Sequence, residues 1–253
     1  MGKDMLGFRI SAHRGAPSEA PENTIPGFII AMGLDVDFIE LDVRASKDNV
    51  LVVIHDEFVD RTTNGHGRVS ELYFDELRKL DAGSWFSERF CGTRIPTLKE
   101  ALMLLSQCNK NIIVDIKVEG YEKKIVRMID LFNIRDRVWI ASHIWSVLAR
   151  TRDLDNTIPL MAIIHEVNGT TLKLTSKLDI SMLAPRLWDI TYDNMNLFRK
   201  YGLLVNAGII NDPSLIPRYI DMGVDTISTD NPKLISEYRK TFWLSKQIKK
   251  PIS

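Results

Sequence analysis

Short runs rich in isoleucine, valine and leucine recur along the chain and alternate with longer amphipathic segments. Eight of these runs are typical of β-strands: residues 8–12, 37–43, 111–117, 137–143, 159–164, 179–185, 203–208 and 225–230. Strands that are apolar without alternation are buried on both faces, which is typical of parallel sheets covered by helices. Eight strands with helical segments between most of them predict an α/β fold, the (β/α)8 TIM barrel, and 253 residues match its usual size.

One segment interrupts this alternation. It separates the second barrel strand from the helix that precedes the third, and it is too long for a connecting loop. Within it, residues 44–56 (RASKDNVLVVIHD) predict a strand, a turn and a returning strand. We therefore expect one barrel domain over residues 1–253, with an inserted subdomain at residues 56–97 after the second strand. Trp85 and Phe86 are expected in the core of that subdomain, with a place beside the active site as the alternative.

Charge and composition argue against several functions. The 33 basic and 33 acidic residues give a net charge of zero, whereas a nucleic-acid-binding domain usually carries a basic excess or a basic face. Cys91 and Cys108 are too few for a disulfide framework and are expected to be free thiols, as in a reducing cytoplasm. Residues 1–15 lack the apolar run of a signal peptide, and no run has the ~18 apolar residues of a membrane span. We expect a soluble cytoplasmic protein without nucleic-acid partners or stable membrane insertion.

Polar side chains stand at the ends of the first three barrel strands and of the returning hairpin strand. In a (β/α)8 barrel the active site lies at the carboxyl ends of the strands. The residues found there are His13, Arg14, Glu40, Asp42, His55, Asp115 and Lys117. A turn near Asp48 pairs His55 with Leu41, at the level of the carboxylates of the second strand. We expect these side chains to form one site.

Glu40 and Asp42 are two residues apart on one strand and therefore face the same side of the sheet. Two buried carboxylates repel each other and lose their hydration, and a divalent cation relieves both costs. With Asp115 on the next barrel strand, they make a set of three carboxylates that suits a hard cation, Mg²⁺ or Ca²⁺. Zinc is less favoured because no histidine obviously joins the set. We expect one divalent cation at this site.

His13 and His55 can serve as a general acid and a general base, because the ordinary pKa of histidine lies near neutral pH. Arg14 can hold a phosphate through two hydrogen bonds, and Lys117 can add a point charge. Asn23, in the turn after the first strand, is expected to help cap the first helix and to support the neighbouring site residues. This set of residues suits the cleavage of a phosphate ester.

The motifs around these residues resemble the signature series of the glycerophosphodiester phosphodiesterase family. The matching stretches are AHRG, PENT, ELDVRASKD, VVIHDEFVDRTTNGHGRV, IPTLKEAL, DIK and GVDTISTDNP, in register from residue 10 to about 232. The resemblance implies a (β/α)8 barrel with an insertion after the second strand. It also implies metal-dependent hydrolysis of a small glycerophosphodiester to sn-glycerol 3-phosphate and an alcohol.

The same resemblance implies a role for each matching residue. The family is similar to the phosphatidylinositol-specific phospholipases C, which implies a reaction through a cyclic phosphate. His13 and His55 are then the catalytic pair, with His13 as the first base and His55 as the first acid. The implied metal ligands are Glu40, Asp42 and Asp115, and the implied phosphate contacts are Arg14 and Lys117.

The chain departs from the family pattern at three positions. Asp115 stands where the family usually has glutamate, Gly208 where it commonly has tryptophan, and His143 where it often has phenylalanine. Loss of the tryptophan predicts a wider pocket mouth that admits a bulkier head group or an acyl chain. The alternatives are a lysophospholipase D-like activity, a barrel isomerase or aldolase, and a non-catalytic phosphodiester-binding protein. The sequence also leaves open a homodimer.

Overall fold

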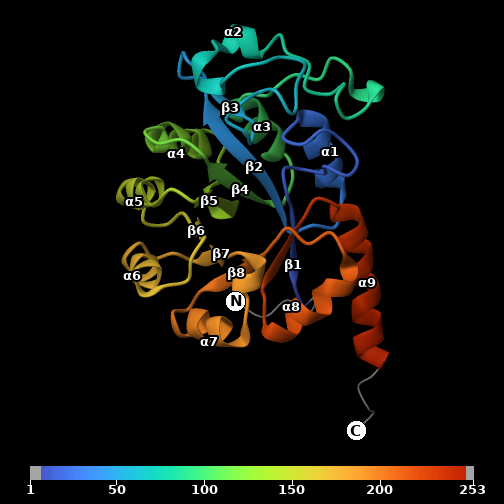
Figure 1. The fold of residues 1–253 in the computed structure, drawn as a ribbon, viewed down its shortest axis with the longest axis vertical. Coiled ribbons are helices and arrows are strands. Elements are labelled where there is room, and N and C mark those ends of the chain that lie inside the picture. Colours follow the sequence, from blue (N-terminus) through green and yellow to red (C-terminus); the bar gives the residue numbers. More distant parts are fainter. Residues whose placement is uncertain (1–6, 249–253) are drawn as a thin grey trace.

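In the computed structural model, the chain forms a closed barrel of parallel strands surrounded by helices (Figure 1). The structure describes residues 7–248, and side chains as far as residue 242. Within residues 7–248 the barrel strands are β1 (Arg9–Ala12), β2 (Phe38–Ala45), β4 (Asn111–Ile116), β5 (Val138–Ser142), β6 (Leu160–Ile163), β7 (Met182–Ala184), β8 (Leu204–Ala207) and β9 (Thr226–Thr229). β1 pairs in parallel with both β2 and β9, and these pairings close the sheet. The (β/α)8 barrel predicted from the apolar runs is confirmed.

Helices cover the outer face of the barrel (Figure 1). They are α1 (Ile25–Gly33), α3 (Leu98–Leu105), α4 (Glu122–Leu131), α5 (Trp145–Leu154), α6 (Gly169–Lys177), α7 (Tyr192–Lys200), α8 (Ile216–Met222) and α9 (Pro232–Ile248). On α3, Leu98, Leu102 and Leu105 recur at helical spacing and are fully buried against the sheet. Burial of each such side chain contributes roughly 1.5–3 kcal/mol. The apolar period thus decides which face of the helix meets the barrel.

The inside of the barrel holds a separate apolar cluster below the polar strand ends. It consists of Phe38, Ile113, Ala141, Met161 and Met182, which come from neighbouring strands. Since alternate residues of a strand face the same side, Phe38 shares its side of β2 with Glu40, and Ile113 shares its side of β4 with Asp115. The buried carboxylates therefore lie on an apolar floor, toward the carboxyl ends of the strands.

β3 (Leu51–Val53) returns antiparallel along β2 and begins the insertion. Val43 pairs with Val53, and the N–H of Ile54 donates to the carbonyl of Asp42. This register brings residue 55 level with the middle of β2, so the predicted hairpin is confirmed.

The rest of the insertion forms a lobe at the top of Figure 1. It contains η1 (Val69–Glu71), α2 (Phe74–Leu77) and η2 (Glu88–Phe90). Its buried residues form a cluster apart from the barrel core: Val52, Ile54, Val59, Val69, Leu77, Ala82 and Ile95. This separate cluster supports our proposal that residues 56–97 are an inserted subdomain.

The prediction that Trp85 and Phe86 form the core of the insertion is wrong. Trp85 is 41% exposed and Phe86 is half-buried, and among the described residues neither belongs to the buried cluster of the lobe. The two rings pack edge to face with their centroids 5.9 Å apart. Nε1 of Trp85 donates to the carbonyl of Ala82, which fixes the ring over a local turn. Aliphatic side chains supply the core instead.

No helix within residues 7–248 is both long and apolar enough to span a membrane. Residues 1–6, the start of the segment searched for a signal peptide, lie outside the described residues. Cys91 and Cys108 are free thiols, as predicted.

Candidate active site

His13 follows β1 and lies where β1 meets β9. Its Nδ1 is 2.7 Å from Oδ1 of Asp230, and its backbone N–H donates to the carbonyl of Thr229. Because the carboxylate engages Nδ1, Nε2 is the ring nitrogen left for chemistry. Burial lowers the pKa of His13, but the hydrogen bond with Asp230 and the negative charge of Glu40 outweigh it, so the net pKa is raised.

The turn after β1 aims Arg14 at the carboxylates. Arg14 has a φ of 54° and Gly15 a φ of 91°, a left-handed conformation that suits glycine and strains other residues. In this conformation the backbone N–H of Arg14 donates to Oε2 of Glu40 at 2.7 Å. The guanidinium group contacts Asp42, with Nε 3.1 Å from Oδ2, and Glu22, at 2.9 Å. The turn therefore ties the end of β1 to the carboxylates of β2.

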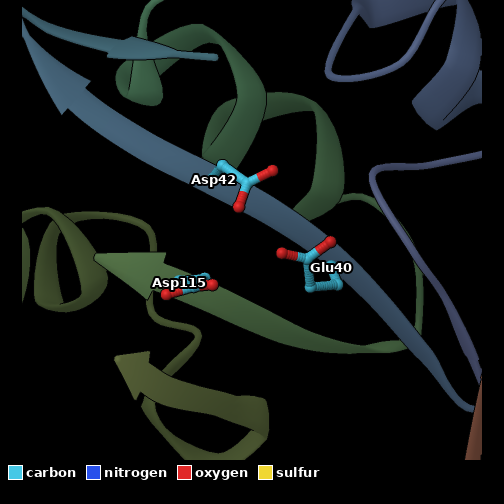
Figure 2. Close-up of side chains that lie close together, drawn as sticks. All are labelled: Glu40, Asp42 and Asp115. Carbon is cyan, nitrogen blue, oxygen red and sulfur yellow. The ribbon is translucent and has the colours of Figure 1, made fainter. Parts of the chain in front are cut away.

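Glu40, Asp42 and Asp115 come together from the neighbouring strands β2 and β4 (Figure 2). All three are buried, and one oxygen from each lies within 4.8 Å of the others. Oδ1 of Asp115 has no hydrogen-bond partner among the described residues. Burial and the charge of Asp42 raise the pKa of Glu40 to about 8. A divalent cation would give Oδ1 of Asp115 a partner and would stabilise the ionised form of Glu40. The three residues therefore fit such an ion.

Asp42 is held from several sides. Nδ2 of Asn23 donates to its Oδ2 at 2.8 Å, and the backbone N–H of Asp42 donates to Oδ1 of Asn23 at 3.1 Å. Nζ of Lys117 lies 3.2 Å from Oδ1 of Asp42 and also bonds Asp115. Burial raises the pKa of Asp42, but the charges of Lys117 and Arg14 outweigh it and lower the pKa overall. Asp42 is therefore the one carboxyl of this set whose pKa its neighbours lower overall.

His55 lies at the end of the hairpin strand, and its Nδ1 is 2.6 Å from Oδ1 of Asp56. Nε of Arg61 donates to Oδ2 of Asp56, and the terminal nitrogens of Arg61 donate to both oxygens of Glu22. Glu22 in turn accepts a hydrogen bond from Arg14. Burial is the main cause that lowers the pKa of His55. A chain of ion pairs thus fixes the insertion, and His55 with it, to the turn after β1.

A cavity of about 270 Å³ opens among the strand ends. One side is polar and is lined by His13, Arg14, Glu40, His55, Asp115 and Lys117. The other side, from the ends of β6, β7 and β8, is mostly apolar and includes Met161, Ile163, Ile164, Ala184, Pro185 and Ile209. Asp42 is buried behind the polar side, in contact with Arg14 and Lys117. The structure thus brings all of the site residues predicted from sequence together.

Gly208 lines the cavity, and its backbone packs closely against Ser228 of β9. A Cβ at residue 208 would lie 2.6 Å from Cβ of Ser228, so a tryptophan could enter here only if the backbone moved. Nδ2 of Asn206 donates to Oγ of Ser228 at 3.0 Å, which adds a polar point to the floor of the cavity. His165, in the loop after β6, also lines the cavity.

Two carboxylates hold the histidines, Asp230 and Asp56, and the sequence predicted a role for neither. Asp56 directly follows His55 at a strand end, and that adjacency is the signal that could have found it. Asp230 is 217 residues away from His13, and no local pattern connects the two. The expectation that Asn23 helps cap α1 is wrong, because the side chain of Thr24 caps this helix.

Comparison with known proteins finds relatives over nearly the whole chain. The model of the glycerophosphoryl diester phosphodiesterase family matches residues 13–234. A glycerophosphodiester phosphodiesterase of Caldanaerobacter subterraneus subsp. tengcongensis is 37% identical over 242 residues, which cover 91% of this chain and 98% of that protein. A glycerophosphodiester phosphodiesterase of Bacillus subtilis is 29% identical, over 91% of this chain and 86% of that protein.

Solved structures share the barrel over nearly its full length. A phosphodiesterase of Oleispira antarctica, solved in complex with the product sn-glycerol-3-phosphate, matches with a TM-score of 0.86 and 27% identity, over 92% of this chain and 96% of that one. A glycerophosphodiester phosphodiesterase of Agrobacterium tumefaciens matches with a TM-score of 0.80 and 28% identity, over 91% and 99% of the two chains.

Proposed function

This chain belongs to the glycerophosphoryl diester phosphodiesterase family and is an enzyme of that class, and we propose that it works by acid–base catalysis at one divalent cation. In this proposal His13 and His55 move the protons while the carboxylates hold the cation. The products are sn-glycerol 3-phosphate and an alcohol. The observation that carries the proposal is the placement of both histidines, each held at Nδ1 by a carboxylate, on the wall of a cavity that also contains three clustered carboxylates.

Glu40, Asp42 and Asp115 would hold the cation. An all-oxygen set of this kind favours Mg²⁺ or Ca²⁺ over zinc. When bound, the cation supplies positive charge to the phosphate oxygens as negative charge develops on them. Arg14 and Lys117 lie on the same wall and add fixed positive charge there. The contacts of Arg14 and Lys117 with Asp42 hold both side chains on this wall of the cavity.

In the first proposed step, Nε2 of His13 removes the proton from the 2-hydroxyl of the glycerol. The freed oxygen bonds to phosphorus, and the bond from phosphorus to the alcohol oxygen breaks. His55 gives its proton to that departing oxygen, so the alcohol leaves neutral and a cyclic glycerol phosphate remains. Asp230 and Asp56 keep the two rings oriented through their Nδ1 atoms.

In the second proposed step the two histidines exchange roles. His55, now neutral, removes a proton from water, whose oxygen bonds to phosphorus. The bond from phosphorus to the 2-oxygen breaks, and His13 returns its proton to that oxygen. The site then holds sn-glycerol 3-phosphate and both histidines are in their starting states. From the described residues alone, the pKa of His13 is raised and that of His55 is lowered, the reverse of the first-step roles. A cation at the carboxylates would offset the charge of Glu40, one of the groups that raise the pKa of His13.

Incubation of the protein with glycerophosphocholine, followed by phosphorus NMR, tests the proposal directly. We expect the glycerol 3-phosphate signal to grow with Mg²⁺ or Ca²⁺ present and to stop growing after EDTA, because the carboxylates then lose the ion that they position. Restoring the cation should restore turnover. Equal rates with and without EDTA would refute the metal requirement, and no product with any cation would refute the reaction.

A lysophospholipase D-like activity is the second candidate, because apolar side chains such as Ile163, Ile164 and Pro185 line one side of the cavity. An acyl chain on the glycerol could lie against them. The kcat/KM values for lysophosphatidylcholine and glycerophosphocholine separate the two functions. We expect the small diester to be the better substrate, since the cavity of about 270 Å³ suits a small diester better than an acyl chain. A preference for the lysophospholipid would make it the main reaction.

A further inference from the structure

Arg186 stands at the rim of the catalytic cavity, on the side away from the carboxylates. It lines the cavity just after β7. In the closed strand order β1-β9-β8-β7-β6-β5-β4-β2, β7 lies four strands from β2 in either direction. Arg186 is therefore across the mouth of the barrel from Glu40, which lies on β2.

Arg186 differs from the other two permanent cations of the cavity wall, because they are already paired. Arg14 and Lys117 both contact Asp42. In the part of the chain that the structure describes, the guanidinium of Arg186 makes no hydrogen bond or ion pair. It rests on the ring of Trp188, with Cζ 5.3 Å from the ring centroid. Arg186 is thus free to bind an anion that enters the cavity.

The surroundings of Arg186 favour a negative group over a positive one. Among the described residues, those that line the cavity from β6 to β8 include no carboxylate. An ammonium group placed there would meet the like charge of Arg186. The face of Trp188 could otherwise attract such a cation, but Arg186 already occupies an aromatic face of that residue. An anionic group would gain a charge-assisted hydrogen bond.

Resting on the proposed function, we propose that Arg186 is a specificity-determining residue that selects glycerophosphodiesters whose alcohol carries an anionic group. With the phosphate held beside β1, β2 and β4, the alcohol would extend across the cavity to meet Arg186 after β7. A carboxylate on that alcohol can accept two parallel hydrogen bonds from the guanidinium. Glycerophosphoserine has such an alcohol, with a carboxylate beside its ammonium group, whereas the head group of glycerophosphocholine carries only a cation.

Glycerophosphoserine and glycerophosphoethanolamine form a matched substrate pair, because their head groups differ only by the carboxylate. We expect the wild-type protein to have the higher kcat/KM for glycerophosphoserine. The variant Arg186→Gln should lose about tenfold in kcat/KM for glycerophosphoserine, chiefly through KM, and little for glycerophosphoethanolamine. Arg186→Lys should keep part of the preference, since the charge remains and the paired hydrogen bonds do not.

Arg218→Gln is the matched control, because Arg218 also rests on a neighbouring ring, that of Tyr219, but lies on α8 outside the cavity lining. It should leave both substrates unchanged. An equal fold-loss of kcat/KM for both substrates in Arg186→Gln would place Arg186 on the phosphate or the glycerol and overturn the proposal, and so would the absence of a loss for either substrate. Metal-dependent turnover of glycerophosphoethanolamine would keep the proposed function intact in either case. Failure of the wild type to cleave either diester would overturn both.

Discussion

Replacing His13 or His55 with asparagine is expected to lower kcat by about 10²–10⁴-fold while KM changes little, because each histidine moves a proton in the transition state. Both rings line the cavity, and each is held at Nδ1 by a carboxylate that leaves Nε2 for the reaction. The double variant should be scarcely slower than the slower single variant, since the two residues act in one step. His66→Asn, which changes an exposed histidine of the insertion, should retain full activity.

A substrate with a good leaving group separates the roles of the two histidines. Glycerol 3-(p-nitrophenyl) phosphate releases p-nitrophenolate, which needs no proton from an acid. The His55 variant should therefore regain most of its first-step rate on this substrate, whereas the His13 variant should not. The burst of p-nitrophenolate in stopped-flow absorbance gives the rate. Rescue of the His13 variant instead would reverse the proposed order, and activity of either variant near wild type on glycerophosphocholine would refute the pair.

Replacing Glu40 with glutamine is expected to abolish cation-dependent turnover and yet to stabilise the cation-free protein at pH 8. Burial and the neighbouring Asp42 raise the pKa of Glu40 to about 8 in the folded chain, from an ordinary value of 4.5. The folded state therefore binds a proton more tightly than the unfolded state, and stability falls as the pH rises between those two values. One such proton contributes a slope of up to ~1.4 kcal/mol per pH unit. A glutamine at residue 40 cannot ionise, and its side-chain oxygen can still accept the hydrogen bond from the backbone N–H of Arg14.

Urea unfolding in EDTA, measured at several pH values from 5 to 8, tests this expectation. The wild type should lose stability across that range, and Glu40→Gln should lose less. Mg²⁺ or Ca²⁺ should stabilise the wild type increasingly as the pH rises, because the ion binds the ionised carboxyl. Glu237→Gln, an exposed change on α9, is the control and should follow the wild type. A wild-type stability that is flat or rising in EDTA would contradict the assigned environment of Glu40.

The barrel could be predicted from sequence because each of its strands is marked by a short apolar run of neighbouring residues. The hairpin could be predicted for a similar reason, because a turn near Asp48 sets its register and pairs Val43 with Val53. That register alone is enough to fix the level of His55 along β2. Glu40 and Asp42 could be grouped for a similar reason, since the period of a strand puts them on one side.

The residues that sequence reasoning missed depend on contacts between distant segments. Asp230 meets His13 only because β9 closes the barrel against β1. Trp85 lies at the surface because aliphatic residues on either side of it already fill the small core of the lobe. Gly208 lies close to Ser228 because the backbone after β8 packs against β9, and no pattern in the sequence predicts this contact.

The contact between His13 and Asp230 also has a consequence for the newly made chain. A ribosome produces His13 early and must add another 217 residues before the carboxylate that orients it exists. At about 5–20 residues per second this interval lasts roughly 10–40 s. For most of it, once residues up to 55 have been made, Glu40, Asp42 and His55 are present without the carboxylate that orients His13. On the proposed mechanism, hydrolysis therefore begins only when the last barrel strand has docked.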